Sequence, residues 1–99
     1  MPTNKLFRLH PKAENDLEDI YLYTYHEFGV TQADYYIRQL ESAFQNLANY
    51  PGIARQCGDI WADLMAFTVG SHVVFFKTNQ SGITVVRVLH QSMDYVQHL

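Results

Sequence analysis

Residues 69–90, VGSHVVFFKTNQSGITVVRVLH, form the stretch that decides the fold of this chain. Residues 73–76 are an apolar run too short for a core helix, and their β-branched and aromatic side chains favour a strand buried on both faces. The polar residues 78–82 are typical of a turn, and residues 83–89 follow as a second apolar run. The stretch therefore predicts an antiparallel pair of strands.

Two further strands are expected outside this stretch. Residues 64–69 (LMAFTV) precede it and turn at Gly70-Ser71 into the central run. Residues 5–9 (KLFRL) form a short strand candidate at the start of the chain. Residues 53–63 look like a loop, and the tail from residue 91 is mostly polar.

Two amphipathic helices are predicted between the first strand and the loop. Pro11 suits the first position of one helix, and Gly29 suits its C-terminal end. Thr31, with Asp34 three residues later, is a candidate N-cap for the second helix, which should stop before Pro51. The apolar residues of both recur at helical spacing, and the short connection predicts an antiparallel hairpin.

The element order strand, helix, helix, then three strands predicts an α+β fold as a single domain over residues 1–99. The helical hairpin should pack on one face of a curved antiparallel β-sheet, with the first strand at an edge or between later strands. Both alternating sets of residues 73–76 are apolar, and nothing in the chain is expected to cover the second face. Such an uncovered apolar face predicts a partner.

Composition narrows the function. The formal net charge of −3 argues against tight, nonspecific nucleic-acid binding by the chain alone. Cys57 is the only cysteine, so neither an intramolecular disulfide nor a thiolate cluster can form. No segment is apolar over the length that a membrane span needs and no signal peptide is evident, so the expected location is the cytoplasm.

Few side chains suggest chemistry. The five histidines do not show the spacing of a helical zinc site, so neither a metal nor another cofactor is expected. Ser71 and His72 are neighbours that face opposite ways on a strand, which argues against an activated serine. Asp16, Glu18 and Asp19 are expected to be solvated carboxylates that match the helix dipole.

Arg87 and His90 are the best candidates for a site, near one end of the sheet, with Met93 and Asp94 just after. An arginine and a histidine together could bind a phosphate and move a proton, as RNA cleavage requires. The alternative is structural: Arg87 pairs with an acidic side chain, and His90 only ends the strand.

Segments along nine-tenths of the chain, in the right order, resemble ParE-type toxins of the RelE/ParE superfamily. Residues 9–13 (LHPKA) and 28–29 (FG) are among these segments, and the closest match is residues 69–76 (VGSHVVFF), then 85–90 (VVRVLH) with Met93-Asp94. The resemblance implies the toxin half of a type II toxin–antitoxin pair. It also implies a ParD-like antitoxin whose C-terminal segment folds onto the toxin and lays apolar side chains into its grooves.

The superfamily offers two activities. ParE-type members poison DNA gyrase without a chemical step of their own, whereas RelE-type members cleave messenger RNA on the ribosome. The acidic charge and the residues RVLHxxMD at 87–94 favour the gyrase poison. A third reading is a non-toxic homologue that only binds an antitoxin. Three positions depart from the ParE pattern: Trp61, Met65 and Thr68.

Site residues follow from the resemblance as hypotheses. No catalytic residue is expected for a gyrase poison, and Arg87 and His90 would be catalytic in the RelE-like alternative. The target-facing residues would be Arg87, His90, Met93 and Asp94. Candidates for contact with the antitoxin are Leu17, Tyr21, Tyr25, Tyr36, Leu40, Val74 and Phe76.

Overall fold

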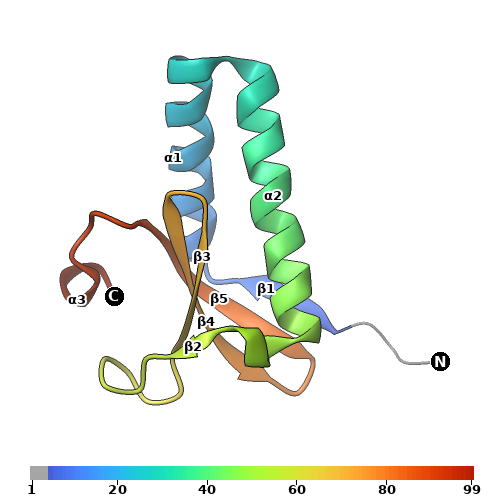
Figure 1. The fold of residues 1–99 in the computed structure, drawn as a ribbon, viewed down its shortest axis with the longest axis vertical. Coiled ribbons are helices and arrows are strands. Elements are labelled where there is room, and N and C mark those ends of the chain that lie inside the picture. The colour runs from blue at the N-terminus through green and yellow to red at the C-terminus, as the bar shows by residue number, and fades with distance from the viewer. Residues whose placement is uncertain (1–4) are drawn as a thin grey trace.

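The structure, a computed structural model, describes residues 5–99 as a helical hairpin on a five-stranded sheet (Figure 1). The strands are β1 (Leu6–Leu9), β2 (Arg55–Gln56), β3 (Met65–Val69), β4 (His72–Asn79) and β5 (Gly82–His90). Their order in the sheet is β1-β5-β4-β3-β2. Two-residue turns join β3 to β4 and β4 to β5, so these three strands are antiparallel, as predicted.

β1 makes the sheet mixed rather than purely antiparallel. It lies at an edge and pairs parallel to β5, from Leu6 opposite Gly82 to Leu9 opposite Val85. Parallel neighbours need a long connection, and the hairpin together with β2–β4 supplies it. The α+β class and the order of the main elements are confirmed, with β2, a short 3₁₀ helix (Pro51–Ile53) and α3 (Tyr95–His98) in addition.

The hairpin consists of α1 (Pro11–Phe28) and α2 (Val30–Asn49), and Gly29 is the only residue between them. Gly29 has φ +91 and caps both helices, so the prediction of Thr31 as an N-cap was wrong. Thr31 lies inside α2, because a glycine with positive φ can reverse the chain in one residue. α1 begins at Pro11 and α2 ends at Asn49, before Pro51, as predicted.

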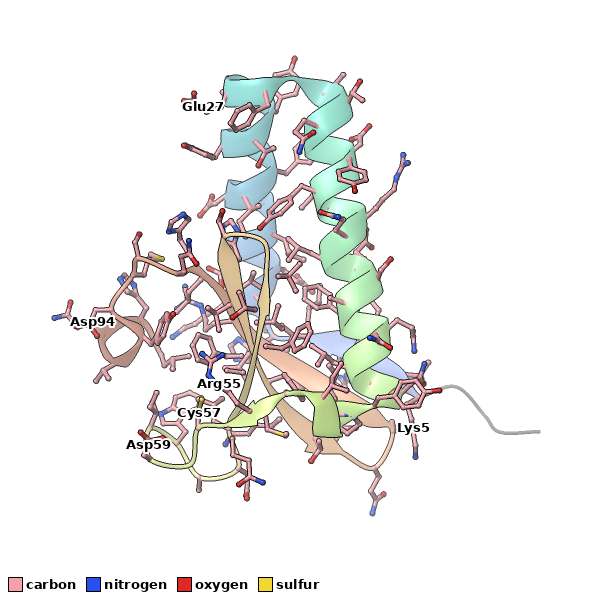
Figure 2. The ribbon with its side chains drawn as sticks, in the orientation of Figure 1. Lys5, Glu27, Arg55, Cys57, Asp59 and Asp94 are labelled. Carbon is pink, nitrogen blue, oxygen red and sulfur yellow. The ribbon has the colours of Figure 1, made fainter. Side chains whose placement is uncertain are left out.

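The main core lies between the hairpin and one face of the sheet. Leu40, Phe44 and Leu47 of α2 pack with side chains of β4 and β5, including Val74 and Phe76, and all five are fully buried. The far half of the hairpin extends past the sheet, and Glu27 lies near its free end (Figures 1 and 2).

The second face of the sheet is covered, contrary to the prediction. Val73, Phe75 and Leu89 are buried there with Cys57, Leu64 and Ala66, and Ile60, Tyr95 and Leu99 pack on them. The rings of Phe75 and Tyr95 lie 4.9 Å apart. In Figure 2 Cys57 lies between α3 and the loop that precedes β3. The C-terminal segment and this loop therefore do what a partner was expected to do.

A β-bulge in β5 sets which side chains meet at its end. Phe75 pairs with Arg87 and Phe76 pairs with Val85, so Val86 is the extra residue. The bulge shifts the following register by one residue and brings His72 of β4 opposite His90. No helix within residues 5–99 has both the length and the apolar character that crossing a bilayer requires.

Candidate functional site

Asp16 and Arg87 join α1 to the edge of β5 where β1 has ended. Arg87 Nε and Nη2 donate to the two carboxylate oxygens of Asp16, each at 2.8 Å. The backbone N–H of Val88 donates to Asp16 Oδ2 at 2.9 Å, which satisfies an edge amide that β1 is too short to reach. Arg87 Nη1 donates to the backbone oxygen of His98. One carboxylate thus ties the helix, the strand and the C-terminal segment together.

The expectation that Asp16 is a solvated carboxylate was therefore wrong. The side chains of Arg87 and Asp16 keep only 16% and 12% of their exposure. The hydrogen bonds to Asp16 raise the pKa of Arg87, against the opposing effect of burial. Because the guanidinium already has three acceptors, its pairing matches the structural alternative that the sequence left open.

Tyr36 of α2 fixes the turn between β3 and β4. Its hydroxyl accepts the backbone N–H of Ser71 at 3.2 Å and lies 3.1 Å from the oxygen of Val69 and 2.6 Å from His72 Nδ1. We assign the proton of neutral His72 to Nδ1, because Tyr36 can then accept from His72 and donate to Val69. Burial raises the pKa of Tyr36, although the Ser71 amide opposes this.

His72 also contacts His90, and the two rings lie 5.3 Å apart, edge to face. The Nδ1 atom of His90 accepts the backbone N–H of Ser92 at 3.1 Å and lies 2.7 Å from its hydroxyl. Burial lowers the pKa of His72, the charge of His90 adds to this, and Asp16 opposes it. The pair is thus built around a neutral His72.

Acid should destabilise the protein through His72. Its pKa in the folded protein lies below the ordinary 6.5, so the unfolded chain takes up the proton first as the pH falls. The stability that neutral His72 contributes is fully present above the ordinary pKa of 6.5. It is lost as the pH falls through the lower pKa of the folded protein. Urea midpoints at about pH 7.5 and 5.5 should differ less in His72→Gln than in the wild type. The same change at the exposed His26 should leave the pH dependence intact, and equal slopes in all three proteins would refute this role for His72.

Beside these groups lies a groove of about 560 Å³, here called the hairpin groove. It runs between the hairpin, the β3–β4 turn and the end of β5, with Met93 at one side. Seven of its fourteen lining residues are apolar or aromatic, and the polar ones include two carboxylates and two histidines but neither lysine nor arginine. The lining residues are Asp16, Asp19, Ile20, Tyr23, Thr24, Phe28, Gln32, Tyr36, Ser71, His72, Val88, Leu89, His90 and Met93.

The proposed target-facing residues are partly gathered at this groove. His90 and Met93 line it and are exposed. Arg87 lies behind Asp16, and Asp94 is exposed and caps α3 by accepting the N–H of Val96. In Figure 2 Asp94 lies in the C-terminal segment, away from the hairpin.

The proposed antitoxin contacts divide by burial. Leu40, Val74 and Phe76 are fully buried in the main core, so a partner could reach them only if the hairpin moved. Of the other four, Tyr36 lines the groove, Leu17 is half-buried against the core, Tyr21 donates to Asp34, and Tyr25 is exposed.

Sequence reasoning missed Asp19, Tyr23 and Phe28 as groove residues. Tyr23 and Phe28 are 65% and 69% exposed, which is unusual for large side chains on a packed helix. In the sequence, Tyr23 lies off the helical spacing of the apolar residues in α1. A large aromatic side chain at such a position indicates a surface contact, and this was the signal for a groove residue. The three positions that depart from the ParE pattern, Trp61, Met65 and Thr68, do not line the groove.

Within the part of the chain that the structure describes, no three side chains of the types His, Cys, Asp and Glu lie together so as to hold a metal ion. What the groove offers is an apolar, aromatic surface with hydrogen-bond acceptors, which suits a peptide segment.

Comparisons with known proteins agree on one family. Residues 7–95 match the family described as "ParE toxin of type II toxin-antitoxin system, parDE". Toxin ParE1 of Mycobacterium tuberculosis is 40% identical over 94% of this chain and 96% of its own length. Toxin ParE1 of Caulobacter vibrioides is 37% identical over 96% and 98%. The structure titled "Chromosomal ParDE TA system from P. aeruginosa" shares the fold, with a TM-score of 0.74 at 15% identity, over 88% of this chain and 96% of that chain.

Proposed function

The chain belongs to the ParE toxin family of type II toxin–antitoxin systems, and from this premise we propose that it inhibits DNA gyrase and thereby blocks replication. A family that pairs a toxin with an antitoxin implies an antitoxin partner for this chain. We further propose that this partner is ParD-like, that the pair acts in the cytoplasm, and that residues 1–99 form one toxin domain.

The hydrogen bonds of Arg87 are the observation that favours a protein target, DNA gyrase, over messenger RNA. Cleavage of RNA needs positive charge around the reactive phosphate and a group that moves a proton. Arg87 already donates hydrogen bonds to Asp16 and to the His98 oxygen, and neither lysine nor arginine lines the hairpin groove. Asp19, a groove carboxylate without an ion-pair partner among residues 5–99, would repel a phosphate there. These features favour action through protein contact over a RelE-like nuclease built on Arg87 and His90.

His90, Met93 and Asp94 are proposed to contact the target. All three are exposed, and they follow one another along the end of β5 and the turn after it. Arg87 would support this surface from behind, because its contact with His98 holds the C-terminal segment on the sheet. The antitoxin is proposed to occupy the hairpin groove, which shares His90 and Met93 with this surface, with Tyr36 among its contacts.

Expression in bacterial cells tests the proposal. Induction should stop growth and switch on a reporter of DNA damage while protein synthesis continues, and co-expression of the antitoxin should restore growth. An immediate stop of protein synthesis with cut messenger RNA would point instead to the nuclease. Normal growth, with antitoxin binding intact, would identify a non-toxic homologue.

A further inference from the structure

The charge of the hairpin groove is unbalanced. Its two carboxylates, Asp16 and Asp19, face a lining that contains neither lysine nor arginine. Asp16 is neutralised by Arg87, which is the only ion pair within residues 5–99. Asp19 is exposed and has no cationic partner in that range. The groove, whose lining also holds His72 and His90, therefore presents one carboxylate without an ion-pair partner to whatever occupies it.

Aromatic side chains stand next to this charge. Tyr23 follows Asp19 by four residues on α1, which places the two on neighbouring turns of one helix face. The Tyr23 ring is 65% exposed, and a ring beside a carboxylate favours a cation, through the ring face and the charge together. Apolar side chains of the lining come from Ile20, Phe28, Val88, Leu89 and Met93.

We propose that the hairpin groove selects an antitoxin segment that carries a lysine or arginine beside its apolar anchors, with Asp19 as the residue that recognises the cation. This rests on the proposed function, because it takes the antitoxin as the occupant of the groove. The apolar anchors would fill the space between Ile20, Phe28 and Met93, while the cation would lie between Asp19 and Tyr23. Asp19 would thus be a specificity-determining residue that rejects antitoxins lacking a cation at that point.

Titration of the chain with its proposed ParD-like antitoxin tests the proposal. Asp19→Asn should weaken binding about tenfold, because one charge-assisted contact is lost. Asp19→Lys should weaken it considerably more, because the new positive charge repels the cation of the antitoxin. Glu18→Gln is the matched control, because Glu18 is exposed on the same turn but does not line the groove. It should change the affinity less than twofold.

The antitoxin side of the contact can be identified in the same assay. Each lysine and arginine of its C-terminal segment is replaced by glutamine and titrated against both wild type and Asp19→Asn. One of these replacements should weaken binding to the wild type but not to Asp19→Asn, which is the signature of a direct pair. Raising the salt concentration should weaken the wild-type complex more than the Asp19→Asn complex.

Three results would overturn the proposal. If Asp19→Asn and Asp19→Lys bind the antitoxin with unchanged affinity, the groove does not recognise a cation of the antitoxin. A wild-type chain that binds no antitoxin would refute the proposed function itself, and this is visible before any variant is made. A dimer of the isolated chain that Asp19→Lys dissociates would show that a second copy fills the groove.

Discussion

Replacing Gly82 by alanine is expected to lower the free energy of unfolding by about 3 kcal/mol or more. A Cβ at this position would lie 1.9 Å from the carbonyl oxygen of Leu6 and 2.8 Å from its amide nitrogen. Both atoms belong to the backbone of β1, so rotation of a side chain cannot relieve the clash. The φ of +148 adds backbone strain for any residue with a side chain. β1 should separate from β5 in this variant.

Gly52→Ala is the matched control. An added Cβ there meets no atom within 4 Å and Gly52 has no positive φ, so its stability should stay within about 0.5 kcal/mol of the wild type. Urea unfolding followed by circular dichroism measures both variants. Equal stability of Gly82→Ala and Gly52→Ala would show that β1 does not approach β5 as closely as described.

The second large effect is expected at Asp16. Asp16→Ala leaves Nε and Nη2 of Arg87 and the Val88 N–H without their acceptor at a site that is mostly buried, which should cost about 3 kcal/mol. Asp16→Asn should cost about 2 kcal/mol, because its amide oxygen can still accept one of these donors. Growth arrest should weaken with it, since α1 and the C-terminal segment are held through this pair.

A double-mutant cycle separates the pair from its surroundings. The costs of Asp16→Ala and Arg87→Ala should not add, because both remove the same contact. Asp19→Ala, an exposed carboxylate on the same helix, should change stability by no more than about 0.5 kcal/mol. Full additivity of the two changes would mean that the ion pair contributes nothing to the fold.

Local sequence patterns predicted the main helices and strands of the fold, but not β2, the 3₁₀ helix or α3. The β-branched runs around Val73 and Val85 predicted β4 and β5, and the helical spacing of apolar residues predicted the hairpin. The parallel pairing of β1 could not be predicted, because four residues carry no signal of their neighbour. The cover of the second face was missed because Ile60, Tyr95 and Leu99 lie singly in polar segments.

The candidate site was harder to predict because it depends on long-range contacts and on one irregularity. Asp16 and Arg87 are 71 residues apart in sequence, and neither one indicates the other. Counted from the Asn79–Gly82 pair without a bulge, His72 would face Leu89 rather than His90. The bulge at Val86 therefore brings the two histidines together, and no residue in the apolar run 83–89 predicts a bulge. The family was identified from the resemblance to ParE toxins, because composition and periodicity alone do not distinguish one small α+β domain from another.

The measurement that tests the central claim most directly is a gyrase assay with the purified chain. Toxin is added to gyrase, ATP and relaxed plasmid, and supercoiling and enzyme-linked DNA breaks are scored, while ribosomes with messenger RNA are treated in parallel. The account predicts lost supercoiling or trapped breaks with the messenger RNA intact, and no effect once the antitoxin is added. Cut messenger RNA with gyrase unaffected would contradict it and would make His90 a catalytic candidate.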